Sequence, residues 1–174
     1  GNNAQLGQRL GWRTDTNFGD QQLGCLGQAI DGTEWPNAQA LAAHLQQALG
    51  RAPVWVGADD VTRPIRRVAW CSGGAQSYFE AAIAAGADAF VTGEISEPQA
   101  HLARETGVAF FACGHHATER YGAPAVAAHV AQNLGLQHQF IEIDNRPFFQ
   151  ATAPVRAKYG APYADLMNRI AAVR

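Results

Sequence analysis

The sequence has little of what marks a secreted, membrane-bound or nucleic-acid-binding protein. Its three cysteines are far apart and form no C-x-x-C pair, so neither a zinc ribbon nor a disulfide framework is indicated. It has no signal-peptide pattern, and no apolar run approaches the roughly 20 residues of a membrane-spanning helix. The net charge is −2 and the basic residues form no stripe, which gives no electrostatic reason to expect nucleic acid. We therefore expect a cytoplasmic protein without a membrane or nucleic-acid partner.

What the chain does contain is typical of a folded protein with many turns. Of its 174 residues 47% are hydrophobic, and 18 are Gly and 8 are Pro. This length suits one domain, or one domain with part of another. Cys71 and Cys113 each end an apolar run, so we expect small buried side chains in a reducing compartment.

The alternation of apolar runs and helical patterns after residue 64 predicts the fold class. Strands are expected at residues 65–71, 89–92, 108–113 and 139–143, and helices at residues 78–85, 97–104 and 124–134. Because strands alternate with helices over short connections, we predict an α/β fold, a three-layer αβα architecture with a mainly parallel sheet.

The part of the chain before residue 65 has weaker signals. Asn37 is the expected cap of a helix over residues 38–49, which ends at Gly50. Residues 12–32 are polar and glycine-rich without a lasting periodicity, and they predict a connection that holds one short strand near residues 23–26.

The domain organisation is suggested by an internal similarity. Residues 1–11 resemble residues 121–135 in having a turn, a helix and a terminal glycine, although short helices also look alike by chance. The expected parts are a remnant of a first α/β domain with its connection (residues 1–20), an α/β domain (residues 21–145) and a tail with one amphipathic helix (residues 146–174, helix 163–173).

The strongest chemical signal follows the strand at residues 108–113 and reads GHHATER. In a helical turn His115 and Glu119 are an i, i+4 pair, with Cβ atoms about 5–6 Å apart, which is close enough to bind or bridge metal ions. The carboxyl end of a strand is where open α/β sheets usually place such groups. The alternative is a helix start with a dipole-favoured Glu119 and two surface histidines, His115 and His116.

Two other turns follow predicted strands, and we expect both to lie at the same carboxyl edge of the sheet as His115. The turn that begins with Ser72, Gly73 and Gly74 has the geometry to hold an anion on backbone amides, although an ordinary tight turn explains it equally well. Glu94 follows the next strand, and His101 lies in the helix after it. These two side chains could orient metal ligands or substrate. Alternatively, Glu94 is an acid that leads a helix and His101 is a half-buried helix residue.

Three segments carry a resemblance to a known family. They read VAWCSGG at residues 68–74, GADAFVTGE at residues 86–94 and GHHATER at residues 114–120. In this order and at this spacing they closely resemble the YbgI-like dinuclear metal-centre family, also called GTP cyclohydrolase I type 2 homologues. The resemblance covers residues 1–145.

This resemblance implies two similar α/β domains with a pair of metal ions between them, and a toroidal homohexamer. His115 and Glu119 match the metal ligands of the family's G-H-x-A-T-E motif. The other ligands belong to the first domain, so this chain resembles a carboxyl-terminal portion that contains the second of the two similar domains.

Nitrogen and carboxylate ligands suit two divalent ions of zinc, manganese or iron. The resemblance then implies a metal-dependent hydrolase in which Glu119 bridges or chelates the ions, and a nucleotide or another phosphoester is the substrate. The alternative is a non-catalytic metal-binding or partner-binding scaffold that forms a ring.

Overall fold

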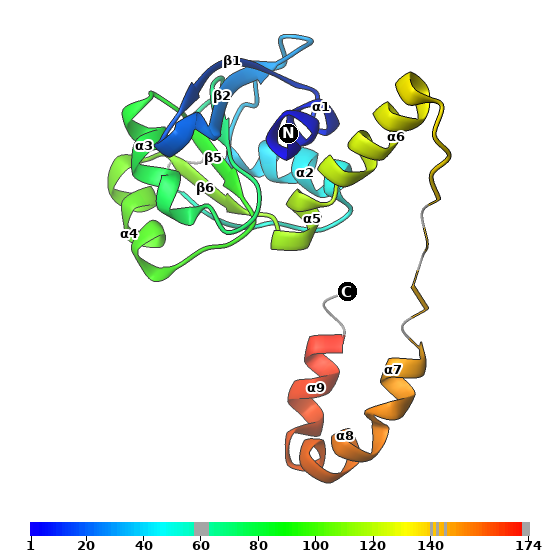
Figure 1. The fold of residues 1–174 in the computed structure, drawn as a ribbon. Coiled ribbons are helices and arrows are strands. Elements are labelled where there is room, and N and C mark those ends of the chain that lie inside the picture. Colours follow the sequence, from blue (N-terminus) through cyan, green and yellow to red (C-terminus); the bar gives the residue numbers. More distant parts are fainter. Residues whose placement is uncertain (58–62, 140, 142, 145, 172–174) are drawn as a thin grey trace. The chain divides into compact units, whose positions relative to one another are not determined.

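The chain forms two compact units, Gly1–Leu136 and Gln137–Arg174 (Figure 1). The computed structural model describes residues 1–57, 63–139, 141, 143, 144 and 146–171, and only the backbone of residues 156, 161, 167, 170 and 171. Helix α1 (Asn2–Arg9) belongs to the first unit, where its Leu6 and Leu10 are buried in the core. The origin of residues 1–20 in another domain stays a prediction.

A six-stranded sheet forms the centre of the first unit, in the order β1-β2-β4-β5-β6-β3. The strands are β1 (Trp12–Phe18), β2 (Gly24–Ala29), β3 (Val54–Val56), β4 (Val68–Trp70), β5 (Ala89–Thr92) and β6 (Ala109–Ala112). Strands β4, β5 and β6 pair in parallel, whereas β1 with β2, β2 with β4, and β3 with β6 pair antiparallel. The sheet is therefore mixed, and the expected parallel arrangement holds only for its three central strands.

The prediction of a connection over residues 12–32 is wrong, because residues 12–29 form an antiparallel hairpin of β1 and β2. The short strand expected near residues 23–26 is found as part of β2. In β1 only the terminal Trp12 and Phe18 are buried, and the polar residues between them are exposed. The pairing shifts between Thr14 and Thr16, which interrupts the two-residue alternation that identifies a strand. A half-exposed strand with an irregularity therefore resembles a polar loop in sequence.

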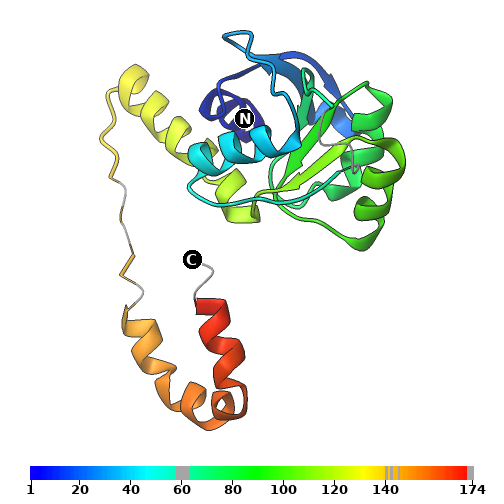
Figure 2. The same cartoon turned by 180° about the vertical axis from the view of Figure 1, so that it is seen from behind.

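Helices cover both faces of the sheet, which confirms the three-layer α/β class (Figures 1 and 2). Helices α1 and α2 (Ala38–Leu49) pack on one face, and α3 (Phe79–Ala84) and α4 (Glu97–Thr106) pack on the other. Neighbouring residues of the central strands alternate between the two cores: Val68 and Trp70 face the first, and Ala69 faces the second.

Helix α2 follows the sequence prediction closely. The side-chain oxygen of Asn37 accepts a hydrogen bond from the amide of Ala40 at 2.9 Å, and Gly50 ends the helix in the left-handed conformation. Leu41, Leu45 and Leu49 are buried. Each such leucine contributes roughly 1.5–3 kcal/mol to stability by leaving water. The cap and this apolar stripe explain why the helix was predictable.

Two further helices complete the first unit: α5 (His115–Glu119) and α6 (Gly122–Leu134). The short 3-10 helices are η1 (Asp20–Gln22), η2 (Gln76–Tyr78) and, in the second unit, η3 (Ala161–Tyr163). No strand includes the described residues 139, 141 and 143; the predicted strand's other residues, 140 and 142, lie outside the described part.

The second unit contains more helix than predicted. It has α7 (Arg146–Ala151), α8 (Ala153–Gly160) and α9 (Ala164–Ala171), where one helix over residues 163–173 was expected. Pro147 and Pro154 lie in the first turns of α7 and α8, where proline is compatible with a helix.

Candidate metal centre

Three turns meet at one edge of the sheet, where the parallel strands β4, β5 and β6 end. The amide of Gly93, after β5, donates to the carbonyl of Gly73, after β4, at 2.8 Å. The amide of Gly114, after β6, donates to the carbonyl of Gly93 at 2.9 Å. These backbone bonds bring the side chains that follow the three strands to one place, as the sequence predicts for the carboxyl edge of a parallel sheet.

The imidazole of His115 lies between two carboxylates at this edge. Its Nε2 is 2.9 Å from Oε2 of Glu119, one helical turn further along α5. Its Nδ1 is 2.5 Å from Oε1 of Glu94, which follows β5. About half of each side chain is exposed, with fractions of 49% for His115 and Glu119 and 47% for Glu94. The three groups are therefore within reach of solvent and small ligands.

The two carboxylates favour a protonated imidazole. The hydrogen bond to Glu94 is the main cause that raises the pKa of His115 above its usual value of 6.5, and the negative charge of Glu119 adds to it. When Nδ1 donates its proton to Glu94, the lone pair of a neutral ring is on Nε2, which faces Glu119. This carboxylate–histidine arrangement is common behind metal-binding histidines.

The glycines after β4 leave room for these side chains. A Cβ atom on Gly73 would lie 2.1 Å from Oε1 of Glu119 and 3.2 Å from Nε2 of His115. Gly73 also has a φ of +72°, which side chains disfavour. A Cβ on Gly74 would lie 3.5 Å from Oε2 of Glu94. The turn therefore needs glycine at residue 73 to admit the Glu119 carboxylate.

The amides of this turn are already hydrogen-bonded within the protein. The amide of Ser72 donates to Oδ1 of Asn3 at 2.8 Å, and that of Gly73 donates to Oγ1 of Thr118 at 3.0 Å. The amide of Ala75 donates to Oγ1 of Thr92 at 3.3 Å. An anion site on the turn of Ser72, Gly73 and Gly74 stays a prediction, and a ligand on the amide of Ser72 or Gly73 would have to displace one of these bonds.

Four residues that support the site were not singled out from the sequence. Two of them, Thr92 and Thr118, are fully buried polar residues that hold the three turns together. The other two, Asn2 and Asn3, begin α1.

The two asparagines connect α1 to the site from one side. Oδ1 of Asn2 accepts a bond from the amide of Gly122 at 2.8 Å, and its Nδ2 donates to the carbonyl of Thr118 at 2.8 Å. Asn3 reaches the turn after β4. The only sequence signal for these roles is a pair of amide side chains at a helix start.

The remaining predicted residues are more distant from this arrangement. His116 is exposed on α5 and His101 is exposed on α4. In the described part of the chain, neither forms a hydrogen bond or ion pair with His115, Glu94 or Glu119. A role for them in orienting ligands or substrate stays a prediction.

The donor set fits part of a metal site. Among the described residues, no group of three or more His, Cys, Asp or Glu side chains converges on a point that could hold an ion. Nε2 of His115 and the Glu119 carboxylate converge as a pair, with Glu94 on the opposite ring nitrogen. Zinc sites usually have four ligands, so this pair would supply about half of them.

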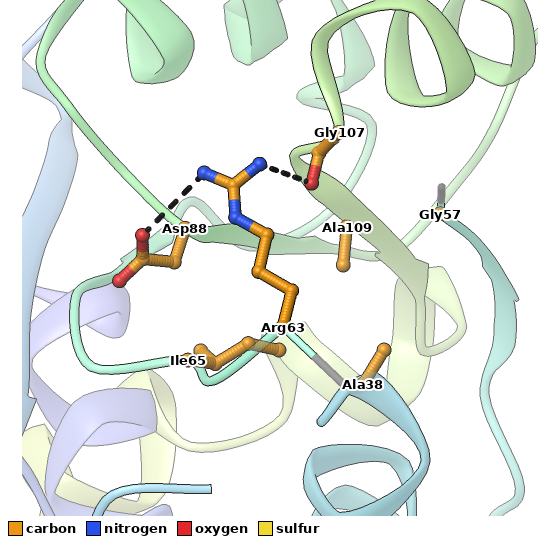
Figure 3. A pocket seen from close by; sticks show the side chains of 7 residues that line it. All are labelled: Ala38, Gly57, Arg63, Ile65, Asp88, Gly107 and Ala109. Atoms are coloured by element: carbon orange, nitrogen blue, oxygen red, sulfur yellow. Dashed lines mark hydrogen bonds and ion pairs between the residues drawn. The ribbon is translucent and has the colours of Figure 1, made fainter. Parts of the chain in front are cut away.

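A separate small cavity lies at the other end of the parallel strands (Figure 3). Arg63 spans it, donating to the carbonyl of Gly107 at 2.8 Å and lying 3.8 Å from the carboxylate of Asp88. The cavity has a volume of about 20 Å³, which is enough for roughly one water molecule. The carboxylate of Asp88 also accepts hydrogen bonds from the amides of Arg66 and Arg67, at 3.0 and 2.9 Å. These bonds connect the segment before β4 with the segment before β5.

Cys71 and Cys113 are buried, as expected, and so is Cys25; all three are free thiols in the two cores. Within the described residues, no helix combines the length and the apolar character that crossing a membrane requires.

Comparisons with known proteins agree with the fold and the order of motifs. Residues 1–147 match the family model described as Duf34/NIF3 (NGG1p interacting factor 3). A GTP cyclohydrolase 1 type 2 homolog of Neisseria meningitidis serogroup A is 54% identical over 140 residues, which are 79% of this chain and 53% of the relative. The homolog of Pseudomonas aeruginosa is 43% identical over 151 residues, or 83% of this chain and 56% of the relative.

A solved structure of the protein ybgI, described as of unknown function, superposes with a TM-score of 0.73 at 41% identity, covering 83% of this chain and 56% of that one. The chain thus spans about half the length of the relatives that it matches. The motif resemblance, the family model and the structural similarity agree, and the chain belongs to the Duf34/NIF3 family.

Proposed function

We propose that this chain supplies part of a dinuclear metal centre in a metal-dependent hydrolase. The observation that carries the proposal is the His115–Glu119 pair, 2.9 Å apart at the carboxyl edge of the sheet, with Glu94 on the other ring nitrogen. The histidine lies between two carboxylates, next to a glycine that leaves room for one of them. This arrangement is well suited to divalent cations.

In this proposal the chain's own residues have distinct roles. Nε2 of His115 and the carboxylate of Glu119 would hold the ions, and Glu119 has two oxygens with which to chelate or bridge. Glu94 keeps the proton on Nδ1 and fixes the plane of the ring. Thr118 and Asn2 hold α5 against the turn after β4, so that the ligand pair keeps its position. Such supporting hydrogen bonds typically affect metal affinity about 10–100-fold.

The ions fit this site by the chemistry of its donors. One imidazole nitrogen with carboxylate oxygens suits zinc, manganese or iron. When bound, two such ions would polarise the electrophilic bond of a substrate and acidify a water for hydrolysis. The remaining ligands would come from another part of a longer chain or from another subunit.

The names of the relatives support a nucleotide as the substrate. The curated relatives are called GTP cyclohydrolase 1 type 2 homologs, which suggests hydrolytic opening of the purine ring of GTP. Hydrolysis of a phosphoester is the other reaction that the chemistry of two metal ions would allow. Assembly into a homohexamer and a cytoplasmic location belong to the same proposal, as the family resemblance implies both.

The test is hydrolysis of GTP and of p-nitrophenyl phosphate, with zinc, manganese or ferrous iron added, by a protein that contains this chain together with the part that supplies the remaining ligands. We expect metal-dependent turnover that His115→Ala and Glu119→Ala abolish. His129→Ala is the matched control, because His129 is exposed on α6 and contacts Asn133 of the same helix. Metal bound through His115 without turnover of any of these compounds would favour the alternative, a metal-binding or partner-binding scaffold.

A further inference from the structure

A second concave site lies between α1 and the first turn of α6, and it does not include His115, Glu94 or Glu119. Two arginines and two glutamines line it: Gln5, Gln8, Arg9 and Arg120. It is a shallow depression with a volume of about 470 Å³ that is wide open to solvent. No aspartate or glutamate is among the residues that line this groove.

Hydrogen bonds to the backbone hold both arginines in place. Nε of Arg9 donates to the carbonyl of Ala48, and a terminal nitrogen of Arg120 donates to the carbonyl of Leu49, each at 2.9 Å. Each bond uses one of the five N–H groups of a guanidinium, so both side chains keep donors for a ligand. The two carbonyls are adjacent at the end of α2, which brings the two arginines together.

The positive charge of the groove is not neutralised by the described residues. Four other arginines lie within 4 Å of a carboxylate: Arg13, Arg63, Arg66 and Arg146. Arg9 and Arg120 have carbonyl partners and, in the described part of the chain, no carboxylate partner. The end of α2 carries only about −0.5 of an elementary charge, so two guanidiniums leave roughly +1.5.

The first turn of α6 adds to this field. Pro124 and Ala125, near the start of the 13-residue helix, line the groove. The amino end of a helix carries about +0.5 of an elementary charge. An anion in the groove would therefore meet two guanidiniums and two amide side chains in the field of a helix start, although Pro124 has no amide N–H and the amide of Ala125 donates to the carbonyl of Tyr121.

We propose that this groove binds the phosphate group of a small phosphorylated molecule. Guanidiniums present pairs of parallel N–H groups that match phosphate oxygens, and two of them can bind one phosphate from two sides. The inference stands apart from the proposed hydrolase, because it uses none of the residues of the metal centre.

The test is calorimetric titration of the chain with inorganic phosphate and with pyrophosphate, at constant ionic strength in sodium chloride. We expect saturable binding of one ion per chain. Because a hydrogen bond to a charged group is worth more than one to a neutral group, Arg9→Gln and Arg120→Gln should each weaken binding about tenfold or more. Arg13→Gln, which removes an exposed arginine of β1 paired with Asp15, is the control and should bind as the parent does.

A second measurement is needed in case Arg9→Gln or Arg120→Gln unfolds the protein by removing the hydrogen bond of that arginine to the end of α2. In the unmodified chain, phosphate should shift the Nε–Hε resonances of Arg9 and Arg120 and leave that of Arg13 in place. Absence of saturable binding, equal binding by the two groove variants and the parent, or equal shifts at all three arginines would each overturn the proposal.

Discussion

The side chain of Asn3 joins the first helix to the turn after β4, where its Oδ1 accepts the amide of Ser72 at 2.8 Å. Its Nδ2 donates to the carbonyl of Leu23 at 2.8 Å, so one side chain connects α1 with both the hairpin and the site. The backbone carbonyl of Asn3 also accepts a hydrogen bond from Nε1 of Trp70 at 2.9 Å. Residues 69 positions apart in the sequence are thus joined directly at the edge of the candidate centre.

Asn3→Ala should therefore lower the free energy of unfolding. The change leaves the partly buried amide of Ser72 without its partner, a loss that costs about 1–3 kcal/mol, whereas the exposed carbonyl of Leu23 can bond to water instead. Urea denaturation measures the effect. Gln8→Ala, at an exposed position of the same helix, is the control and should stay within about 0.5 kcal/mol of the parent. Equal effects of the two substitutions would contradict the role of Asn3.

Gly73→Ala should displace the Glu119 carboxylate. The new Cβ would lie 2.1 Å from Oε1 of Glu119, and the left-handed backbone adds roughly 1–2 kcal/mol of strain. Gly32→Ala is a matched control, since Gly32 has a φ of +77° with open space around its Cβ position. We expect both variants to be destabilised in thermal melts, and only Gly73→Ala to change the NMR signals of His115. Unchanged His115 signals in Gly73→Ala would contradict the close approach.

The protonation of His115 in the metal-free protein should depend on Glu94. The hydrogen bond to Glu94 raises the pKa of His115 above 6.5, so Glu94→Gln should lower it. Since the folded pKa lies above the unfolded one, this interaction stabilises the fold fully below pH 6.5 and is lost as the pH rises through the folded value. NMR titration of the ring protons measures the pKa. An unchanged pKa in Glu94→Gln would show that the contact is not formed in solution.

The three thiols should be unreactive in the folded protein. Burial raises the pKa of Cys113 to about 12, and burial is also the main cause of the raised pKa of Cys25 and Cys71. Because the thiolate is the reactive form, a colorimetric disulfide reagent should label the native chain slowly and label all three sites quickly in denaturant. Rapid labelling of one thiol under native conditions would indicate that its core opens locally.

The sequence predicted best what depends on local pattern. The cap at Asn37 and the leucine stripe of α2, and the strand at residues 89–92, were predicted as they are found. So was the contact between His115 and Glu119, because they are neighbours within one helical turn, while their role as metal ligands stays a prediction. In each case the residues that determine the structure lie within a few positions of one another.

What the sequence did not reveal depends on distant contacts. The hairpin of residues 12–29 depends on the pairing of the buried strand β2 with β4. Its other strand, β1, has mostly exposed polar residues, so the local sequence does not show it. Asn2 reaches Thr118 across 116 positions, and no local periodicity indicates such a bond. The tail contains two more helices than predicted, α7 and α8, each with a proline in its first turn, and proline alone does not distinguish a helix start from a loop.

The most direct test of the metal centre is the NMR spectrum of the chain with substoichiometric Mn²⁺, which reports even weak binding. Paramagnetic Mn²⁺ should broaden the ring signals of His115 and leave those of His129, exposed on α6, sharp. Glu119→Ala should abolish this selective broadening. If His115 and His129 broaden equally, or if Glu119→Ala leaves the broadening of His115 unchanged, the His115–Glu119 pair does not bind metal and the proposed centre is wrong.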